Sequence, residues 1–223
     1  SRTGSAQGHA KVLRIAEHIN LVLRYIPYVQ TNFVLGLDSD AGPEPFDLTK
    51  QFIELTPGAF PGYSLLTSFG EAAPINLQYQ LEDRLIGFPF HFLDNNHAMN
   101  MRPRNYSWPD FYARIIDLTQ HTFSNRAIVR RLVATKAFIP RWLNVIRAVS
   151  SEGYGRLRFY GEVRQRLLSD RGFRAYFDQE STVLPQFYTD RIREDLGPMW
   201  NALPAGAIHH DPYAFRKSKA PRV

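Results

Sequence analysis

Cysteine is absent from this 223-residue chain, and several kinds of chemistry are excluded with it. The residues cannot form a disulfide, supply a catalytic thiolate, or hold a thiolate-ligated metal or iron–sulfur cluster. Lysine is scarce, with only five residues, so arginine carries most of the formal net charge of +6. No run of roughly 18 apolar residues occurs, so no stretch has the composition of a membrane-spanning helix.

The remaining composition is that of an ordinary globular protein, with 44% hydrophobic and 22% charged residues. The length suits one large domain, or a domain with a helical extension. The lack of cysteine fits a reducing compartment, and the first residues contain no apolar leader segment. We therefore expect a cytoplasmic location.

Helices and strands alternate in the first part of the chain. Apolar spacing predicts helices at 9–25 and 45–55, and strands at 28–37 and 60–67. The first strand is apolar on both faces from Phe33 onward, which is typical of a buried parallel strand. This alternation indicates a βα barrel or a doubly wound sheet, but two strands complete neither. We interpret the stretch as the end of a larger α/β unit.

The pattern changes after residue 70. A short helix is expected at 77–85, followed by an ordered but irregular segment rich in aromatic residues. Helices are expected at 108–122, 124–148, 153–168 and 180–196, with Ser107 as the N-cap of the first of these. The predicted fold class is α/β: an incomplete (β/α) barrel end with two parallel strands (1–75), an irregular connecting segment (76–107) and a mostly α-helical extension (108–223).

Two stretches resemble a known family. The residues YIPYVQTNFVLGLDSDAGPEPF and those following them to Pro74, and later HFLDNNHAMNMRPRNYSWPDFY, are similar to the final third of the partial barrel in radical S-adenosylmethionine enzymes. The closest resemblance is to the subgroup that carries a cobalamin domain. The order of helix, strand, helix, strand and aromatic segment carries the likeness over roughly residues 1–130.

One family motif, Gly-x-Ile-x-Gly-x-x-Glu on the fifth barrel strand, is matched in part. Val34 takes the place of the isoleucine, which lies against the adenine of the cofactor, and Gly36 matches the second glycine. Asn32 replaces the first glycine, and Ser39 stands where the glutamate would be. The resemblance, together with the position at the carboxyl ends of parallel strands, predicts a site for S-adenosylmethionine formed by Asn32, Val34, Gly36, Asp38, Leu66 and Thr67.

The family's reactive group cannot be held here. Its chemistry needs a Cys-x-x-x-Cys-x-x-Cys loop that binds a [4Fe–4S] cluster, and the chain has no cysteine. The resemblance therefore implies that an upstream part of the same polypeptide holds the cluster, with a cobalamin domain as a further possibility. The start at Ser1, where a fourth βα loop would lie, favours a C-terminal fragment that is not active alone. A degenerate relative without the chemistry is the alternative.

Several residues have two interpretations. Gly36 either lets a flat ring approach the backbone or is a packing point of the strand. Asp38 either contacts a ligand or is a turn residue. His97 either faces the substrate cavity or is hydrogen-bonded within its loop, which we favour. The histidines show no metal-binding spacing, so no metal site is predicted, and the catalytic residues are unknown.

Residues 124–151 form a basic, amphipathic region that contains no acidic residue. Its cations are Arg126, Arg130, Arg131, Lys136, Arg141 and Arg147. Such a region suits a non-catalytic module that binds RNA or an anionic membrane surface, which is the alternative function. We favour a helix packed on the rest of the protein with solvated arginines, kinked at Pro140.

Overall fold

The computed structural model describes residues 5–68, 74–207, 209–211 and 213. The chain divides into two compact units, each formed by two separate stretches. The first unit comprises residues 1–64 and 103–165, and the second comprises 65–102 and 166–223. The predicted domains, with boundaries at residues 75 and 107, are not tested by this division into units and stay a prediction.

The first unit contains the predicted alternation of helix and strand. Its elements are α1 (Ser5–Val22), β1 (Gln30–Leu35), α2 (Glu44–Leu55) and β2 (Phe60–Leu65). The two strands pair in parallel as a two-stranded sheet, which confirms the mixed α/β class. Pro45 and the acids Glu44 and Asp47 stand in the first turn of α2, where proline and negative charge favour helix formation.

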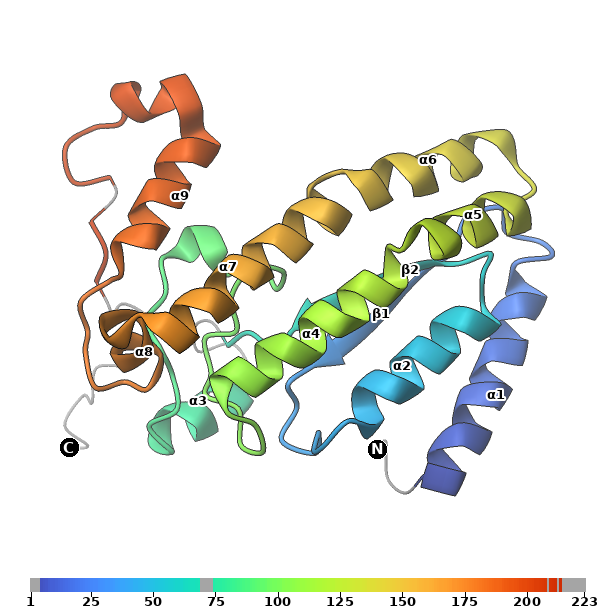
Figure 1. Ribbon diagram of the computed structural model, residues 1–223, viewed down its shortest axis with the longest axis horizontal. Helices are drawn as coiled ribbons and strands as arrows, with labels where there is room; N and C mark the ends of the chain where they lie inside the picture. Colours follow the sequence, from blue (N-terminus) through green and yellow to red (C-terminus); the bar gives the residue numbers. More distant parts are fainter. Residues whose placement is uncertain (1–4, 69–73, 208, 212, 214–223) are drawn as a thin grey trace. The chain divides into compact units, whose positions relative to one another are not determined.

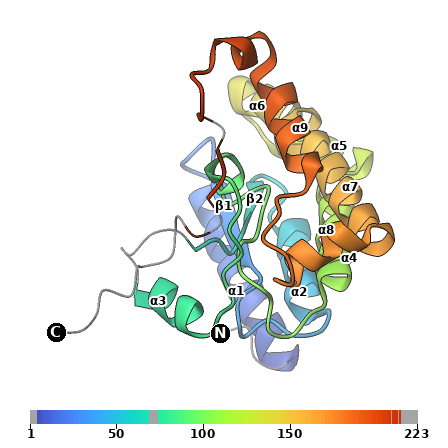
Figure 2. The ribbon, with the colours of Figure 1, turned by 90° about the vertical axis from the view of Figure 1, so that its left-hand side faces the viewer.

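Helices cover one face of this sheet. Figures 1 and 2 show α2 and α4 (Trp108–Thr122) on the same side of the strands. The Phe33 ring of β1 lies 5.2 Å from the Phe52 ring of α2, and the Tyr63 hydroxyl of β2 donates to Thr119 Oγ1 at 2.6 Å. Burial raises the pKa of Tyr63 to about 12. Because side chains alternate along a strand, the neighbours of Phe33 on β1 and of Tyr63 on β2 face the other side of the sheet.

The prediction that β1 is buried on both faces is wrong for one of them. The strand was predicted to be buried on both faces, but Gln30, Asn32 and Val34 are exposed. Other elements normally cover both faces of a parallel sheet. A sheet of only two strands depends on further strands or helices for that covering. The described residues therefore leave one face of the parallel pair uncovered over much of β1.

The helices after residue 107 follow the prediction at first and then depart from it. Helix α4 has the predicted bounds, and Ser107 caps it by accepting from the backbone N–H of Asp110. The predicted helix 124–148 is instead two helices, α5 (Asn125–Ala134) and α6 (Phe138–Val149). The break at Thr135 is held by side chains of α6: Arg141 Nε donates to the Thr135 carbonyl and Asn144 Nδ2 to its hydroxyl.

Pro140 does not kink this region, contrary to expectation. It lies in the first turn of α6, where the missing N–H costs no intrahelical hydrogen bond. A wide, π-helical turn at Ser151–Gly155 then leads into α7 (Arg156–Ser169), where the sequence predicted one helix over 153–168. A Cβ on Gly153 would lie 1.8 Å from the Ala148 carbonyl oxygen, so this turn requires glycine.

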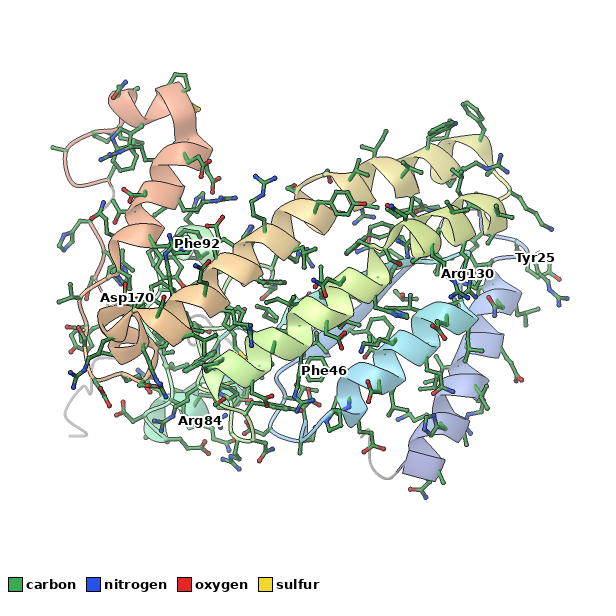
Figure 3. The ribbon with its side chains drawn as sticks, viewed as in Figure 1. Tyr25, Phe46, Arg84, Phe92, Arg130 and Asp170 are labelled. Carbon is green, nitrogen blue, oxygen red and sulfur yellow. The ribbon has the colours of Figure 1, made fainter. Side chains whose placement is uncertain are left out.

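The second unit is built around aromatic side chains. It contains α3 (Pro74–Leu81), a 3₁₀ turn at Phe90–Phe92, α8 (Arg171–Phe177), α9 (Gln186–Leu196) and a 3₁₀ turn at Gly197–Ala202. Helix α3 begins earlier than the predicted 77–85, and residues 180–185, predicted as helical, form a loop. The buried rings include Phe88, Phe92 (Figure 3), Phe173, Tyr176, Phe177 and Tyr188. None of the helices described in either unit is long and apolar enough to cross a bilayer.

Candidate functional site on the uncovered sheet face

The turn after β1 is built by a carboxylate that sequence reasoning did not single out. Asp40 is almost fully buried, and its Oδ2 accepts from the backbone N–H groups of Gly36 and Leu37, both at 3.1 Å. Gly36 has φ of +90°, a conformation that side chains other than glycine rarely adopt. The glycine is thus required by the turn, and its N–H is already engaged. The spacing Gly-x-x-x-Asp at the end of a strand was the available signal.

Asp38 lies at the rim of the same turn and is held from the segment that precedes α4. Asn105 Nδ2 donates to the backbone carbonyls of both Asp38 and Asp40 at 3.0 Å. The Asp38 carboxylate lies 3.7 Å from the Arg104 guanidinium, and the Tyr106 hydroxyl donates to the Gly42 carbonyl. Asp38 is therefore a partly buried turn residue with a cation beside it, and its side chain keeps access to solvent.

Asn32 and Val34 lie on the uncovered face of β1. Asn32 Nδ2 donates to the Ser64 hydroxyl of β2 at 3.2 Å, which joins the two strands across this face. Val34 is 37% exposed. Gly62 of β2 leaves the room for this arrangement, since a Cβ there would lie 2.8 Å from Gln30 Nε2 and 3.3 Å from Asn32 Oδ1. The face thus offers an amide, a hydroxyl and an apolar patch next to each other.

A groove of about 540 Å³ runs between α1 and β1. Its walls are apolar residues of α1 and α2 together with strand residues, among them Val12, Ile15, Ile19, Asn32, Phe33 and Phe52. Asn32 therefore lies both on the uncovered face and at this groove. Since β1 is an outer strand of the described sheet, the groove runs along a strand edge.

Leu66 and Thr67 belong to the second unit, apart from the other predicted site residues. The Thr67 hydroxyl donates within that unit to the carbonyls of Leu65 and Ala98, at 3.1 and 3.2 Å. Next to it, the Ser68 hydroxyl donates to Asn76 Oδ1, and Asn100 Oδ1 accepts from the Ser68 N–H. Thr67 thus stabilises its loop, while Leu66 is partly exposed.

His97 is hydrogen-bonded within its own loop, as favoured from the sequence. Asp94 Oδ2 lies 2.7 Å from His97 Nδ1, and Asp94 Oδ1 accepts from the backbone N–H groups of Asn96 and His97. Although burial by itself raises the pKa of Asp94, the hydrogen bond and charge of His97 and the two N–H groups lower it to about 2. These contacts explain His97 without a ligand.

The lowered pKa of Asp94 predicts that the free energy of unfolding depends on pH in the acidic range. The lowered pKa of Asp94 means that its contribution to folding is complete above its ordinary pKa of 3.8 and is lost as the pH falls through about 2. Because the side chain is 38% exposed, we expect a contribution of only about 1 kcal/mol or less. Urea unfolding between pH 5 and 2 checks this: the stability of Asp94→Asn should fall less steeply than that of the parent. Parallel curves would contradict it.

Metal ligands are not gathered in the described part of the chain. No group of three or more histidine or acidic residues there could hold a metal ion, and the sequence has no cysteine.

Comparisons with protein-family models, curated proteins and solved structures found no match. The chemistry of the uncovered face and of the groove therefore carries the functional argument.

Proposed function

We propose that this chain is the C-terminal part of a cytoplasmic radical S-adenosylmethionine enzyme and is not active alone. It supplies the last strands of a partial barrel, part of the adenosine pocket, and a helical cap over the substrate cavity. An upstream part of the same polypeptide holds the [4Fe–4S] cluster, and a cobalamin domain is a possible further partner. The resemblance of residues 25–74 and 91–112 to that family motivates the proposal.

The observation that carries the proposal is the one-sided covering of a parallel sheet. α2 and α4 pack on one face of β1 and β2, while Asn32 and Val34 lie exposed on the other. In a barrel, helices form the outer layer and the opposite face lines the interior, where ligands bind near the carboxyl ends of the strands. The groove between α1 and β1 lies where a neighbouring strand would pair with β1.

The adenosine part of the cofactor fits the residues present. Asn32 offers an amide that can donate to and accept from a purine or ribose, and Val34 offers an apolar surface for a flat ring. Gly36 lets such a ring approach the strand end, although its N–H already bonds to Asp40 and is not available. Thr67 lies in the second unit and its hydroxyl is engaged with carbonyls, so the proposed adenosine contacts rest on the residues of β1 and the turn after it.

The iron–sulfur cluster does not fit this chain, because thiolate ligands are absent. We therefore assign no step of the reaction to these residues. Their proposed role is to bind and orient the nucleoside and to keep water out of the cavity.

Binding of S-adenosylmethionine tests the proposal. We expect Val34→Asp, introduced into the complete polypeptide after anaerobic cluster reconstitution, to raise the dissociation constant at least about tenfold, or about 1.4 kcal/mol. A carboxylate at this position would have to lose water against the adenine ring. Equilibrium dialysis gives the constant, and the release of 5′-deoxyadenosine under reducing conditions reports turnover.

Val129→Asp is the matched control, since Val129 is also an exposed valine of the first unit but lies on α5. It should leave the dissociation constant within about twofold. Equal effects of the two variants would contradict the placement of the adenosine. A complete polypeptide without a Cys-x-x-x-Cys-x-x-Cys segment would contradict the proposed function itself.

A further inference from the structure

Helix α6 presents its apolar face outward. Phe138, Ile139 and Ile146 are 73%, 77% and 60% exposed. The exposed apolar residues recur at helical spacing and form one continuous stripe, here called the α6 stripe: Phe138, Ile139, Trp142, Leu143, Ile146 and Val149. The sequence had favoured the opposite arrangement, with this helix packed on the protein and its arginines in solvent.

The inward face of α6 carries small and polar residues and is firmly held. Asn144 is buried and bonds to Thr135, while Arg147 donates to the Tyr28 hydroxyl, to Gln30 Oε1 at 2.9 Å and to Glu152 Oε2 at 2.5 Å. The Arg147 guanidinium also lies over the Phe60 ring of β2 at 4.0 Å. These contacts set the rotation of the helix, so the outward direction of the stripe follows from the fold. A contiguous exposed apolar surface of this kind marks an interaction site.

Aromatic and basic residues continue this surface at the N-terminal end of α6. A notch of about 380 Å³ separates the loop after α1 from the turn before α6 and is lined by Arg24, Tyr25, Ile26 and Lys136, among others. Tyr25 is 82% exposed and projects outward just beyond α1 (Figure 3). Arg24 and Lys136 are exposed as well. The apolar stripe thus ends at a notch with two cations and a tyrosine.

The charged residues of α5, α6 and the turn between them are all basic. The sequence from Ser124 to Ser150 contains six basic residues and no acidic one. Helix α5 packs beside α6 (Figure 1), and Lys136 in the turn between them is exposed, whereas Arg126 and Arg130 line a pocket with Ile53 and Glu54 of α2. A partner of this surface must therefore combine an apolar layer with negative charge.

We propose that this surface docks on an anionic lipid bilayer. Helix α6 has 12 residues and is about 18 Å long, too short to span a bilayer but suited to lie in its interface. The α6 stripe enters the boundary between headgroups and acyl chains, and Trp142 and Tyr25 lie at headgroup level. Arg24 and Lys136 bind lipid phosphates at the notch. This inference does not depend on the proposed function.

Vesicle flotation tests the docking. We expect the 223-residue chain to bind vesicles of phosphatidylcholine with phosphatidylglycerol, and to bind pure phosphatidylcholine at least about tenfold more weakly. About 0.5 M salt should largely reverse the binding, because surface charges are then screened. Ile146→Glu should weaken binding at least about tenfold, since it removes buried apolar area and adds a negative charge.

Leu168→Glu is the matched control. Leu168 lies on α7 and is exposed to the same 60% as Ile146, so its substitution should leave vesicle binding unchanged. Arg24→Glu with Lys136→Glu should weaken binding by about fivefold per site and flatten its salt dependence. The same Ile146→Glu effect is expected in the complete polypeptide.

Four outcomes would overturn the proposal. The first is equal binding to neutral and anionic vesicles, and the second is equal loss in Ile146→Glu and Leu168→Glu. The third is binding by the 223-residue chain but not by the complete polypeptide, which would place the stripe against another part of the protein. The fourth is absence of vesicle binding, with dimerisation or RNA binding that Ile146→Glu abolishes instead.

Discussion

Replacing Phe111 with alanine is expected to lower the free energy of unfolding of the first unit by about 3–5 kcal/mol. Phe111 of α4 is fully buried, and its ring lies 5.8 Å from the Tyr106 ring and 6.4 Å from the rings of Phe46 and Trp108. The truncation removes apolar contacts of all three rings and leaves a cavity between α4 and α2. Edge-to-face ring pairs add to the loss.

Urea unfolding monitored by fluorescence measures this change, because Trp108 is buried beside Phe111 and reports on the first unit. Leu168→Ala serves as the control, since Leu168 is 60% exposed and should change stability by no more than about 0.5 kcal/mol. A loss below about 1 kcal/mol in Phe111→Ala would contradict the packing between α2 and α4.

Asp40→Ala is expected to cost about 2–4 kcal/mol, more than its small size suggests. The buried carboxylate accepts the N–H groups of Gly36 and Leu37, and alanine leaves both donors without this acceptor in a buried turn. Hydrogen bonds to a charged group each contribute about 1.5–3 kcal/mol, and relaxation of the turn recovers part of that loss.

Thermal or urea unfolding provides the test, with two comparison variants. Asp40→Asn keeps one acceptor oxygen in place and should lose less than half as much. Asp117→Ala removes an exposed acid that pairs with Lys50 at the surface, and such pairs contribute about 0–1 kcal/mol. If Asp40→Ala were as mild as Asp117→Ala, the turn after β1 would not depend on the buried carboxylate.

Much of the fold could be predicted from local patterns. The bounds of α4 follow from the Ser107 cap and the apolar spacing, and β1 and β2 follow from short apolar runs between glycine and proline. The break between α5 and α6 could not be predicted in this way. It depends on Arg141 and Asn144 bonding back to Thr135, and such tertiary contacts leave no periodic signal.

The candidate site was predictable only in part. Asn32 and Val34 were named from the resemblance of β1, and alternation along the strand places both on the uncovered face. Asp40 was missed as the residue that organises the turn, because its partners are backbone groups. The outward direction of the α6 stripe was also missed, since the spacing of apolar residues shows that a helix has two faces without showing which one the protein covers.

The wide turn at Ser151–Gly155 separates a helix that displays its apolar face from a helix that buries it. Before it, α6 turns its apolar side chains toward solvent, whereas after it Phe159, Tyr160 and Val163 of α7 are buried. Ser150, which lies between α6 and this turn, has an extended backbone (φ −85°, ψ −163°), so the side chains of α6 and α7 do not follow one continuous helical register. This break lets α6 and α7 turn their apolar faces to different surroundings, and Gly153 makes the turn structurally possible, because a Cβ there would lie 1.8 Å from the Ala148 carbonyl oxygen.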